Sequence, residues 1–417
     1  MIDRLAILGA GGDLARRHLL PALADLREQR LLPDGFRTIA VGRERGAPIA
    51  AGEWVMADAT DAEALGRALE PAAGPLVVYL ALPPAVFEPA LAALAQIDLD
   101  PQSRIVVEKP FGTDGASARR LNELVARIVP EERVHRVDHF LVKQTVQNVI
   151  GLRFANRIFE PLWNAHHVER VELRWDETLA LEGRAGYYDA AGALRDMVQN
   201  HLLQLLCLVA MEPPATLGER DLRDRKADVL RAVRSPMPDE IASTSIRARY
   251  RGYAAESGVD PARGTETFAA ATFWIDNWRW AGVPFRLRTG KALAADRHEI
   301  AVVFRPVPHL AFGQTEDPEP NLLRLQLDPD RMSLRIVTNG AGDRFTLEEA
   351  ELDTDFAAQE LPAYARVLLD VLSGDPTLAV RGDEAEESWR IVEPILAAWS
   401  AGTPALLEYD PGSDGPG

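Results

Sequence analysis

The sequence predicts an α/β domain with a parallel sheet, followed by an α+β domain with a large, mainly antiparallel sheet. The chain has 417 residues, more than one ordinary core holds. Strand-like and helix-like segments alternate up to about residue 150, and strand-like alternation dominates afterwards. We therefore assign residues 1–150 to the first domain and residues 151–410 to the second. Residues 411–417 are rich in glycine and proline, and we expect them to be disordered.

The front of the chain alternates short apolar strands with amphipathic helices. This is the pattern of a doubly wound parallel sheet, and a glycine turn after the first strand indicates a Rossmann domain. The segment at residues 46–62 is rich in alanine and glycine, and no strand is predicted in it. We expect strands at residues 4–9, 37–42, 75–84, 104–110 and 133–138, and helices at residues 14–29, 61–71, 86–96 and 116–129.

The second part of the chain shows repeated alternation of apolar and polar residues with few intervening helices. Such alternation favours an antiparallel sheet with one face in the core. We expect strands at residues 166–177, 245–253, 266–280, 299–307, 321–328 and 331–338, and helices at residues 191–212, 362–374 and 384–401.

The charge balance excludes some classes of partner. The formal net charge is −17, so the surface repels nucleic acid and acidic membranes, and neither is expected to bind. The single cysteine, Cys207, cannot form an internal disulfide. The chain starts directly with a strand, without the layout of a signal peptide, and contains no apolar stretch of about 18 residues. We therefore expect a cytoplasmic protein.

Glycines stand between the first predicted strand and helix. Such a turn lets the backbone approach a pyrophosphate, which then lies at the helix N-terminus. The spacing differs from G-x-G-x-x-G because the third glycine is missing, and glycine turns are common in α/β folds. The predicted cofactor-binding residues of this turn are Gly9, Gly11, Gly12, Asp13 and Leu14.

Charged residues follow the second strand, where dinucleotide-binding proteins contact the adenosine ribose. An arginine there accommodates the 2′-phosphate of NADP, whereas an acidic residue binds the ribose hydroxyls of NAD. The chain has Arg43, Glu44 and Arg45 at this point. Two arginines favour NADP, Glu44 keeps NAD open, and a solvated loop cluster fits the spacing equally well.

Lysine is rare in this chain, with four lysines among 46 basic residues. Lys109 follows the strand at residues 104–108, at the edge of the sheet where ligands bind. The next motif is Asp138-His139-Phe140-Leu141-Val142-Lys143. If a helix begins near Phe140, His139 and Lys143 lie one turn apart at its positive end, which suits a phosphate dianion.

Polar residues also interrupt the first half of the helix at 191–212. Burying Asp196, Asn200 and His201 without partners would cost kilocalories, so partners or a function must compensate. Asp196 and His201 are about 140° apart on a regular α-helix, and the sequence alone does not place them on one face.

Long motifs throughout the chain resemble the glucose-6-phosphate dehydrogenase family, in order from about residue 5 to residue 410. They are GDLARR, YLALPP, VVEKPFG, VDHFLVKQTVQN, LRFANRIFEPLWN, GRAGYYDAAGALRDMVQNHLLQ and RWAGVPFRLRTGKAL. The resemblance implies NADP-dependent oxidation of glucose 6-phosphate at C1 in the pentose phosphate pathway, by a homodimer or dimer of dimers associated through the antiparallel sheet. No metal is implied.

The resemblance also implies residue roles. His201 matches the general base that takes the proton of the C1 hydroxyl, and Asp138 matches its carboxylate partner. Arg45 matches the arginine that faces the 2′-phosphate of NADP, and Lys109 matches a lysine that contacts substrate and coenzyme. The remaining matches bind the substrate: His139 and Lys143 at the phosphate, and Glu177, Asp196 and Lys291 at the sugar hydroxyls.

Three residues depart from the family pattern. Phe140 stands in place of a tyrosine, Val142 in place of a glycine, and Asp296 in place of a basic residue that here is adjacent, as Arg297. These changes keep two alternatives open. One is a dehydrogenase for another hexose phosphate or an unphosphorylated sugar, and the other is an inactive homologue that acts as a regulatory subunit. The region after Arg45 and the C-terminal region are both short, and the latter bears on whether a second, structural NADP site exists.

Overall fold

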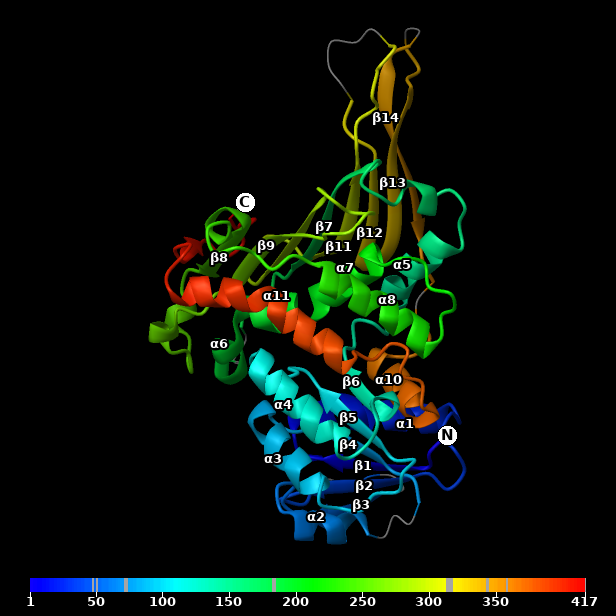
Figure 1. Cartoon of the computed structure of the whole chain (residues 1–417), viewed down its shortest axis with the longest axis vertical. Helices are drawn as coiled ribbons and strands as arrows, with labels where there is room; N and C mark the ends of the chain where they lie inside the picture. The colour runs from blue at the N-terminus through cyan, green and yellow to red at the C-terminus, as the bar shows by residue number, and fades with distance from the viewer. Residues whose placement is uncertain are drawn as a thin grey trace. The chain divides into compact units, whose positions relative to one another are not determined.

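A computed structural model describes residues 1–46, 49, 52–70, 74–181, 185–312, 318–342, 345–357 and 359–416. The chain divides into two compact units, whose elements are labelled in Figure 1. The first unit comprises Met1–Lys143, Pro214–Ala227 and Gln359–Trp389. The second comprises Gln144–Pro213, Asp228–Ala358 and Arg390–Gly417. The order of the two folds along the chain is the predicted one.

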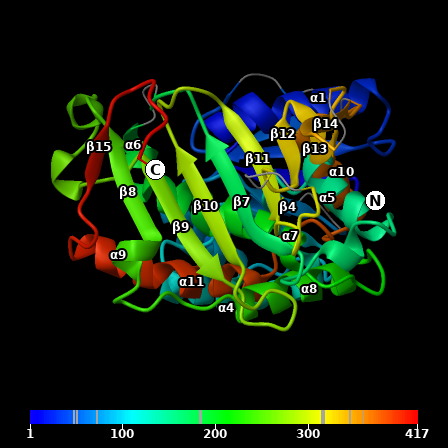
Figure 2. The same cartoon turned by 90° about the horizontal axis from the view of Figure 1, so that it is seen from above.

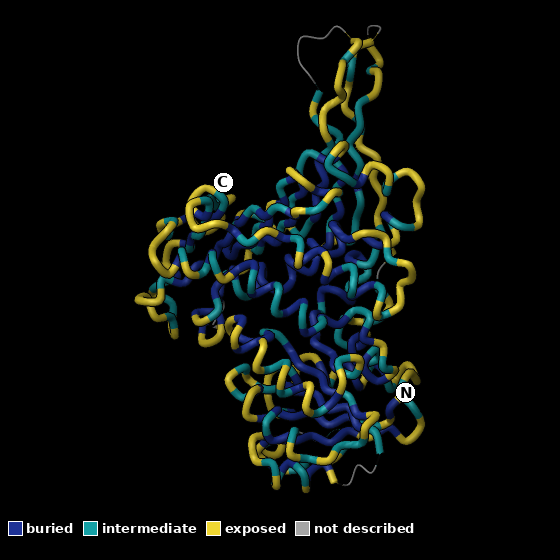
Figure 3. The backbone as a smooth tube through the Cα atoms, in the orientation of Figure 1, coloured by how far each residue is buried: buried dark blue, intermediate teal, exposed yellow. Residues whose placement is uncertain are grey.

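The first unit contains a six-stranded parallel sheet in the order β3-β2-β1-β4-β5-β6. This is the strand order of a dinucleotide-binding Rossmann domain, and the predicted fold is confirmed. Most of its strands are buried (Figure 3). The strands are β1 (Arg4–Leu8), β2 (Arg37–Gly42), β3 (Gly52–Met56), β4 (Val77–Leu80), β5 (Arg104–Glu108) and β6 (Val134–Val137).

Strand β3 is the one strand of this sheet that the sequence did not predict. It lies at the edge of the sheet and pairs only with β2. None of its residues is fully buried, so it lacks the apolar run by which the central strands were found. Its position depends on pairing with β2, which is a tertiary contact.

Helices of the first unit come from distant parts of the chain. They are η1 (a π-helix, Ala15–Leu19), α1 (Leu20–Glu28), α2 (Ala62–Leu69), α3 (Pro84–Leu94), α4 (Gly115–Ala126), η2 (Glu131–Arg133) and α10 (Ala363–Ser373). Helix α10 shares a core with α1 and β1, through residues such as Leu368 and Leu372. The Arg104 guanidinium donates to the carbonyls of Val371 (2.8 Å) and Leu372 (2.7 Å). The first unit also includes residues 214–227 and 359–389, so it is not continuous in sequence, whereas the predicted division was a single boundary at residue 150.

The second unit contains a nine-stranded sheet in the order β14-β13-β12-β11-β7-β10-β9-β8-β15 (Figure 2). Its pairs are antiparallel except β7 with β10 and β8 with β15, which agrees with the predicted mainly antiparallel sheet. The strands are β7 (Val168–Asp176), β8 (Ser245–Tyr250), β9 (Phe268–Trp274), β10 (Pro284–Gly290), β11 (Arg297–Phe304), β12 (Leu322–Asp328), β13 (Asp330–Asn339), β14 (Leu347–Asp355) and β15 (Leu407–Tyr409).

The helical segments of the second unit include the predicted one at residues 191–212, now resolved into parts. They are α5 (Gln144–Phe154), η3 (Glu160–Leu162), α6 (Ala185–Ala193), η4 (a π-helix, Leu194–Leu202), α7 (Leu203–Ala210), α9 (Ile241–Thr244), η5 (Tyr253–Ala255) and η6 (Pro261–Arg263). Helices α8 (Glu219–Ala232) and α11 (Gly382–Ser400) contribute residues to both units. Among the described residues, none of the helices has both the length and the apolar character to cross a bilayer.

The end of the chain is ordered up to residue 416, contrary to the predicted disorder; Gly417 lies outside the described residues. The Gly412 amide donates to the Ala292 carbonyl (2.8 Å), and the Ala294 amide donates to the Ser413 carbonyl (2.9 Å). Arg297 pairs with Asp414 at 3.3 Å. These contacts are made by the backbone and by one distant arginine, so composition did not reveal them.

Candidate active site

The predicted site residues fall into two groups, one in each unit. The first unit contains the glycine turn, Arg45, Lys109, Asp138, His139 and Lys143. The second unit contains Glu177, Asp196, His201 and Lys291.

The glycine turn directly follows β1, as predicted. Gly9 has a φ of +84°, and a Cβ at this position would lie 2.5 Å from the Ala81 carbonyl oxygen. The Gly12 amide donates to the Gly9 carbonyl at 2.8 Å, which tightens the turn. At Gly11 a Cβ would meet no atom within 4 Å, so the backbone is open there. A tight turn with an open backbone before a helix fits the pyrophosphate of a dinucleotide.

The charged residues after β2 differ in their surroundings. Hydrogen bonds from Thr60 and, to a smaller extent, the charge of Arg43 lower the pKa of Asp58. Arg43 is therefore close enough to Asp58 to interact with it. Arg45 is exposed, two residues further along the chain.

Lys109 lies at the carboxyl end of β5, as the sequence predicted. The peptide bond between Lys109 and Pro110 is cis. Gly112 has a φ of +84°, and a Cβ there would lie 2.6 Å from the Ala118 amide nitrogen at the start of α4. The turn after Lys109 is thus packed closely against α4, which restricts the direction of the chain at this point.

The helix considered near Phe140 is absent, because α5 begins only at Gln144. Asp138, which is 3% exposed, accepts a hydrogen bond from the Phe140 amide through Oδ1 (2.9 Å). Two turns follow, in which the amides of Leu141 and Lys143 donate to the carbonyls of Asp138 and Phe140 (both 3.1 Å). His139 and Lys143 are therefore held by turns that the Asp138 side chain caps, and not by the first turn of a helix.

Phe140 is buried between the two basic residues of this turn. Its ring meets the His139 ring edge-on, with centroids 4.9 Å apart. The Lys143 ammonium lies 4.9 Å from the centroid of the Phe140 ring, within cation–π range. The Phe140 ring thus contacts both a histidine and a lysine, and both of these side chains can bind an anion.

Glu177 and Lys291 form an ion pair in the second unit. Glu177 follows β7 and Lys291 follows β10, and these neighbouring strands are parallel. The Lys291 ammonium lies 2.5 Å from Oε2 of Glu177 and 5.4 Å from the centroid of the Tyr188 ring. Lys291 is 8% exposed. A carboxylate and an ammonium fixed in this way offer an acceptor and a donor to sugar hydroxyls.

Asp296, one of the departures from the family pattern, has a local structural role. Its Oδ1 accepts hydrogen bonds from the Thr178 amide (2.6 Å) and hydroxyl (3.0 Å). These bonds lower the pKa of Asp296. The side chain therefore holds the loop that begins with Glu177.

His201 and Asp196 lie on the π-helix η4, where hydrogen bonds join residues five apart. Five residues correspond to about one turn of such a helix, so the two side chains share a face, which a regular α-helix would not allow. His201 is 1% exposed. Tyr187 is hydrogen-bonded to Asp196. Burial is the largest cause of the raised pKa of Tyr187, and the charge of Asp196 and this hydrogen bond raise the pKa further.

Glu266 and the two tyrosines of α6 were not found by sequence reasoning. The Leu194 amide, at the start of η4, donates to Oε1 of Glu266 at 3.0 Å. Burial raises the pKa of Glu266. The tyrosines stand in the quoted motif GYYDAAGAL, which was a usable signal, whereas Glu266 lies far along the chain and had none.

Comparisons with known proteins agree with this geometry. The model of the family "Glucose-6-phosphate dehydrogenase, NAD binding domain" matches residues 6–61 and 53–148. The model of the family "Glucose-6-phosphate dehydrogenase, C-terminal domain" matches residues 150–417. A glucose-6-phosphate 1-dehydrogenase of Treponema pallidum (strain Nichols) is 39% identical, over 99% of this chain and 92% of the relative.

Two solved structures are similar over nearly the whole chain. The glucose-6-phosphate 1-dehydrogenase of Mycobacterium avium has a TM-score of 0.89 and 36% identity, over 100% of this chain and 95% of the other. A glucose-6-phosphate dehydrogenase in complex with its substrate glucose-6-phosphate also has a TM-score of 0.89, with 29% identity over 99% of this chain and 95% of the other.

Proposed function

The chain belongs to the glucose-6-phosphate dehydrogenase family, and from this we propose that it oxidises glucose 6-phosphate at C1 to 6-phosphoglucono-lactone with NADP as the oxidant. The family is one of nicotinamide-dependent oxidoreductases, and when bound the cofactor accepts the hydride from C1. The preference for NADP over NAD is part of the proposal.

The first unit supplies the residues that would hold the cofactor. The open turn from Gly9 to Leu14 would bind the pyrophosphate, because it brings bare backbone to the start of a helix. Arg45 would pair with the 2′-phosphate by charge-assisted hydrogen bonds. Lys109, at the carboxyl end of β5, would contact both cofactor and substrate.

The remaining residues would bind and activate the sugar. His201 would take the proton of the C1 hydroxyl, and Asp138 would orient the imidazole and stabilise its cation. His139 and Lys143, held around Phe140, would bind the phosphate group. Glu177, Asp196 and Lys291 would hydrogen-bond to the sugar hydroxyls.

The observation that carries the proposal is the ion pair between Glu177 and the buried Lys291, in the same unit as a π-helix that presents Asp196 and the buried His201 on one face. An inactive homologue has no need to keep such buried polar groups.

The test is an absorbance assay of nicotinamide reduction with a panel of sugars and sugar phosphates, each with NADP and with NAD. Glucose 6-phosphate with NADP should give the highest kcat/KM. A higher value with another hexose phosphate or with free glucose, or no turnover at all, would replace this proposal by one of the alternatives.

The proposal extends to the state of the protein in the cell. We expect a cytoplasmic homodimer or dimer of dimers that acts in the pentose phosphate pathway and associates through the sheet of the second unit. Light scattering on the purified protein measures the number of subunits.

A further inference from the structure

Glu108, the residue before Lys109, is a buried carboxyl group that the proposed reaction does not use. It is the last residue of β5 and is 6% exposed. Its Oε1 accepts a hydrogen bond from the Tyr79 hydroxyl of β4 at 2.5 Å. The Tyr364 hydroxyl of α10 is also hydrogen-bonded to it. Two tyrosines from different elements therefore hold this carboxyl group.

Tyr364 connects Glu108 to the proposed phosphate ligands. Its ring stacks on the His139 ring, with centroids 5.8 Å apart and planes inclined by 18°. It also stacks on the ring of His18, with centroids 5.0 Å apart. The bond between Tyr364 and Glu108 fixes the tyrosine in a position where its ring contacts His139. One side chain thus links Glu108 to His139.

Charged groups around Glu108 come from the neighbouring strand ends. Glu108 pairs with Val137 in the register of β5 and β6, so Asp138 is the next residue on the adjacent strand. Burial raises the pKa of Glu108 to about 7; the bond from Tyr79 and the charge of Lys109 oppose this, and the charge of Asp138 adds to it. The carboxyl group therefore gains its charge within the physiological range of pH.

We propose that Glu108 is a positioning residue for His139, and that loss of its proton weakens the binding of a sugar phosphate. The reason is electrostatic, because a negative charge in a buried site opposes the approach of a phosphate dianion. Below neutral pH the group is uncharged and this opposition disappears. The inference rests on the proposed function, since it assumes that His139 and Lys143 bind the substrate phosphate.

The first test compares the wild-type protein with Glu108→Gln, which keeps the shape of the side chain and cannot ionise. The dissociation constant of glucose 6-phosphate is measured by calorimetry from about pH 5.5 to about pH 9. Both proteins share the titration of the substrate phosphate, near pH 6, so the ratio of their dissociation constants removes this contribution. As the pH rises through about 7, the affinity for glucose 6-phosphate should fall by roughly three- to tenfold more in the wild-type protein than in the variant. Parallel curves would refute the inference.

A second variant keeps the test decisive if Glu108→Gln does not fold. Tyr79→Phe removes a bond that lowers the pKa of Glu108, so the fall in affinity should move to higher pH. Tyr253→Phe is the matched control, because Tyr253 is also buried and donates to a carboxylate, Asp189, at 2.8 Å. It should leave the pH of the fall unchanged. The role of Glu108 would be contradicted if the affinity of Tyr79→Phe fell at the same pH as that of the wild type. It would also be contradicted if the control shifted by the same amount as Tyr79→Phe.

The two proposals fail in different ways. If the wild-type protein binds no glucose 6-phosphate at any pH, the proposed function fails. If it binds the substrate but the pH dependence is the same with and without the Glu108 carboxyl group, only the role of Glu108 fails.

Discussion

His201 is the residue on which the proposed chemistry depends most directly. Replacing His201 with Asn removes the base but keeps a polar side chain on η4. We predict a fall in kcat of about a hundredfold or more with little change in substrate binding, because proton transfer contributes only in the transition state. Steady-state kinetics and calorimetry on the same variant measure both quantities. A kcat above about a tenth of the wild-type value would show that another group is the base.

In the proposed site, Arg45 is the residue that we expect to distinguish NADP from NAD. Arg45→Ala should raise KM for NADP by about ten- to a hundredfold, since a hydrogen bond to a charged group contributes roughly 1.5–3 kcal/mol. KM for NAD should change little, because NAD has no 2′-phosphate. Arg43→Ala is the matched control, as Arg43 interacts with Asp58. Equal effects of Arg45→Ala on the two cofactors would remove Arg45 from this role.

We expect Phe140 to make the preference for a phosphorylated sugar weaker than a tyrosine at this position would. A tyrosine here could donate a hydrogen bond to a phosphate oxygen, worth roughly 1.5–3 kcal/mol. We predict that Phe140→Tyr lowers KM for glucose 6-phosphate and leaves activity on free glucose unchanged. Val142 does not change this expectation, as it packs in the core of the first unit. A fall in thermal stability with unchanged KM would show that the buried hydroxyl instead lacks a partner.

At the scale of elements, the π-helix η4 depends on the residues that start it. Gly192 has φ 73° and ψ 169°, a region open almost only to glycine. A Cβ at Gly192 would lie 2.4 Å from Oε1 of Glu266, the atom that accepts the Leu194 amide. Gly192 therefore allows Glu266 to hold the first turn of the helix that carries Asp196 and His201.

We predict that Gly192→Ala lowers both stability and kcat. The backbone strain costs on the order of 1–3 kcal/mol, and displacement of Glu266 disturbs η4. Thermal unfolding and kinetics of this variant are compared with those of Gly186→Ala, a position on α6 where a Cβ meets no atom within 4 Å. A similar loss in both variants would mean that the special conformation of Gly192 is unimportant.

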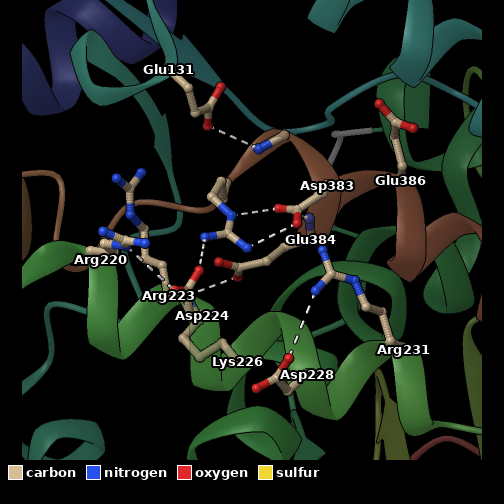
Figure 4. Close-up of polar contacts among 12 residues, drawn as sticks. Glu131, Arg220, Arg223, Asp224, Lys226, Asp228, Arg231, Asp383, Glu384 and Glu386 are labelled. Carbon is tan, nitrogen blue, oxygen red and sulfur yellow. Dashed lines mark hydrogen bonds and ion pairs between the residues drawn. The ribbon is translucent and has the colours of Figure 1, made fainter. Parts of the chain in front are cut away.

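At the scale of the whole molecule, Lys226 has a structural role in the first unit. Lys226 on α8 and Glu384 on α11 lie 3.0 Å apart, with side chains 1% and 0% exposed (Figure 4). Arg381 beside them pairs with Asp224 and Asp383. A buried pair of this kind joins two segments that are more than 150 residues apart in sequence.

Breaking the Lys226 pair should destabilise the folded protein strongly. Lys226→Met leaves the Glu384 carboxylate buried without its counter-charge, at a cost of about 3–5 kcal/mol. The double variant Lys226→Met with Glu384→Leu should recover most of the loss, because neither charge is then buried. Thermal unfolding measures both proteins. A single variant as stable as the wild type would mean that Glu384 is compensated by other groups.

The sequence by itself determined the two kinds of fold, their order, and the motifs that hold the glycine turn, Lys109 and the Asp138 turn. These features follow from periodicity and residue chemistry within about 20 residues. The tertiary structure decided which distant residues complete them: Glu266 at the start of η4, Leu372 against Arg104, and Tyr364 against Glu108 and His139. It also decided that Asp196 and His201 share a face and that residues 411–416 are ordered. Hydrogen bonds across 72 or 268 residues form only when the chain packs, and no local pattern encodes them.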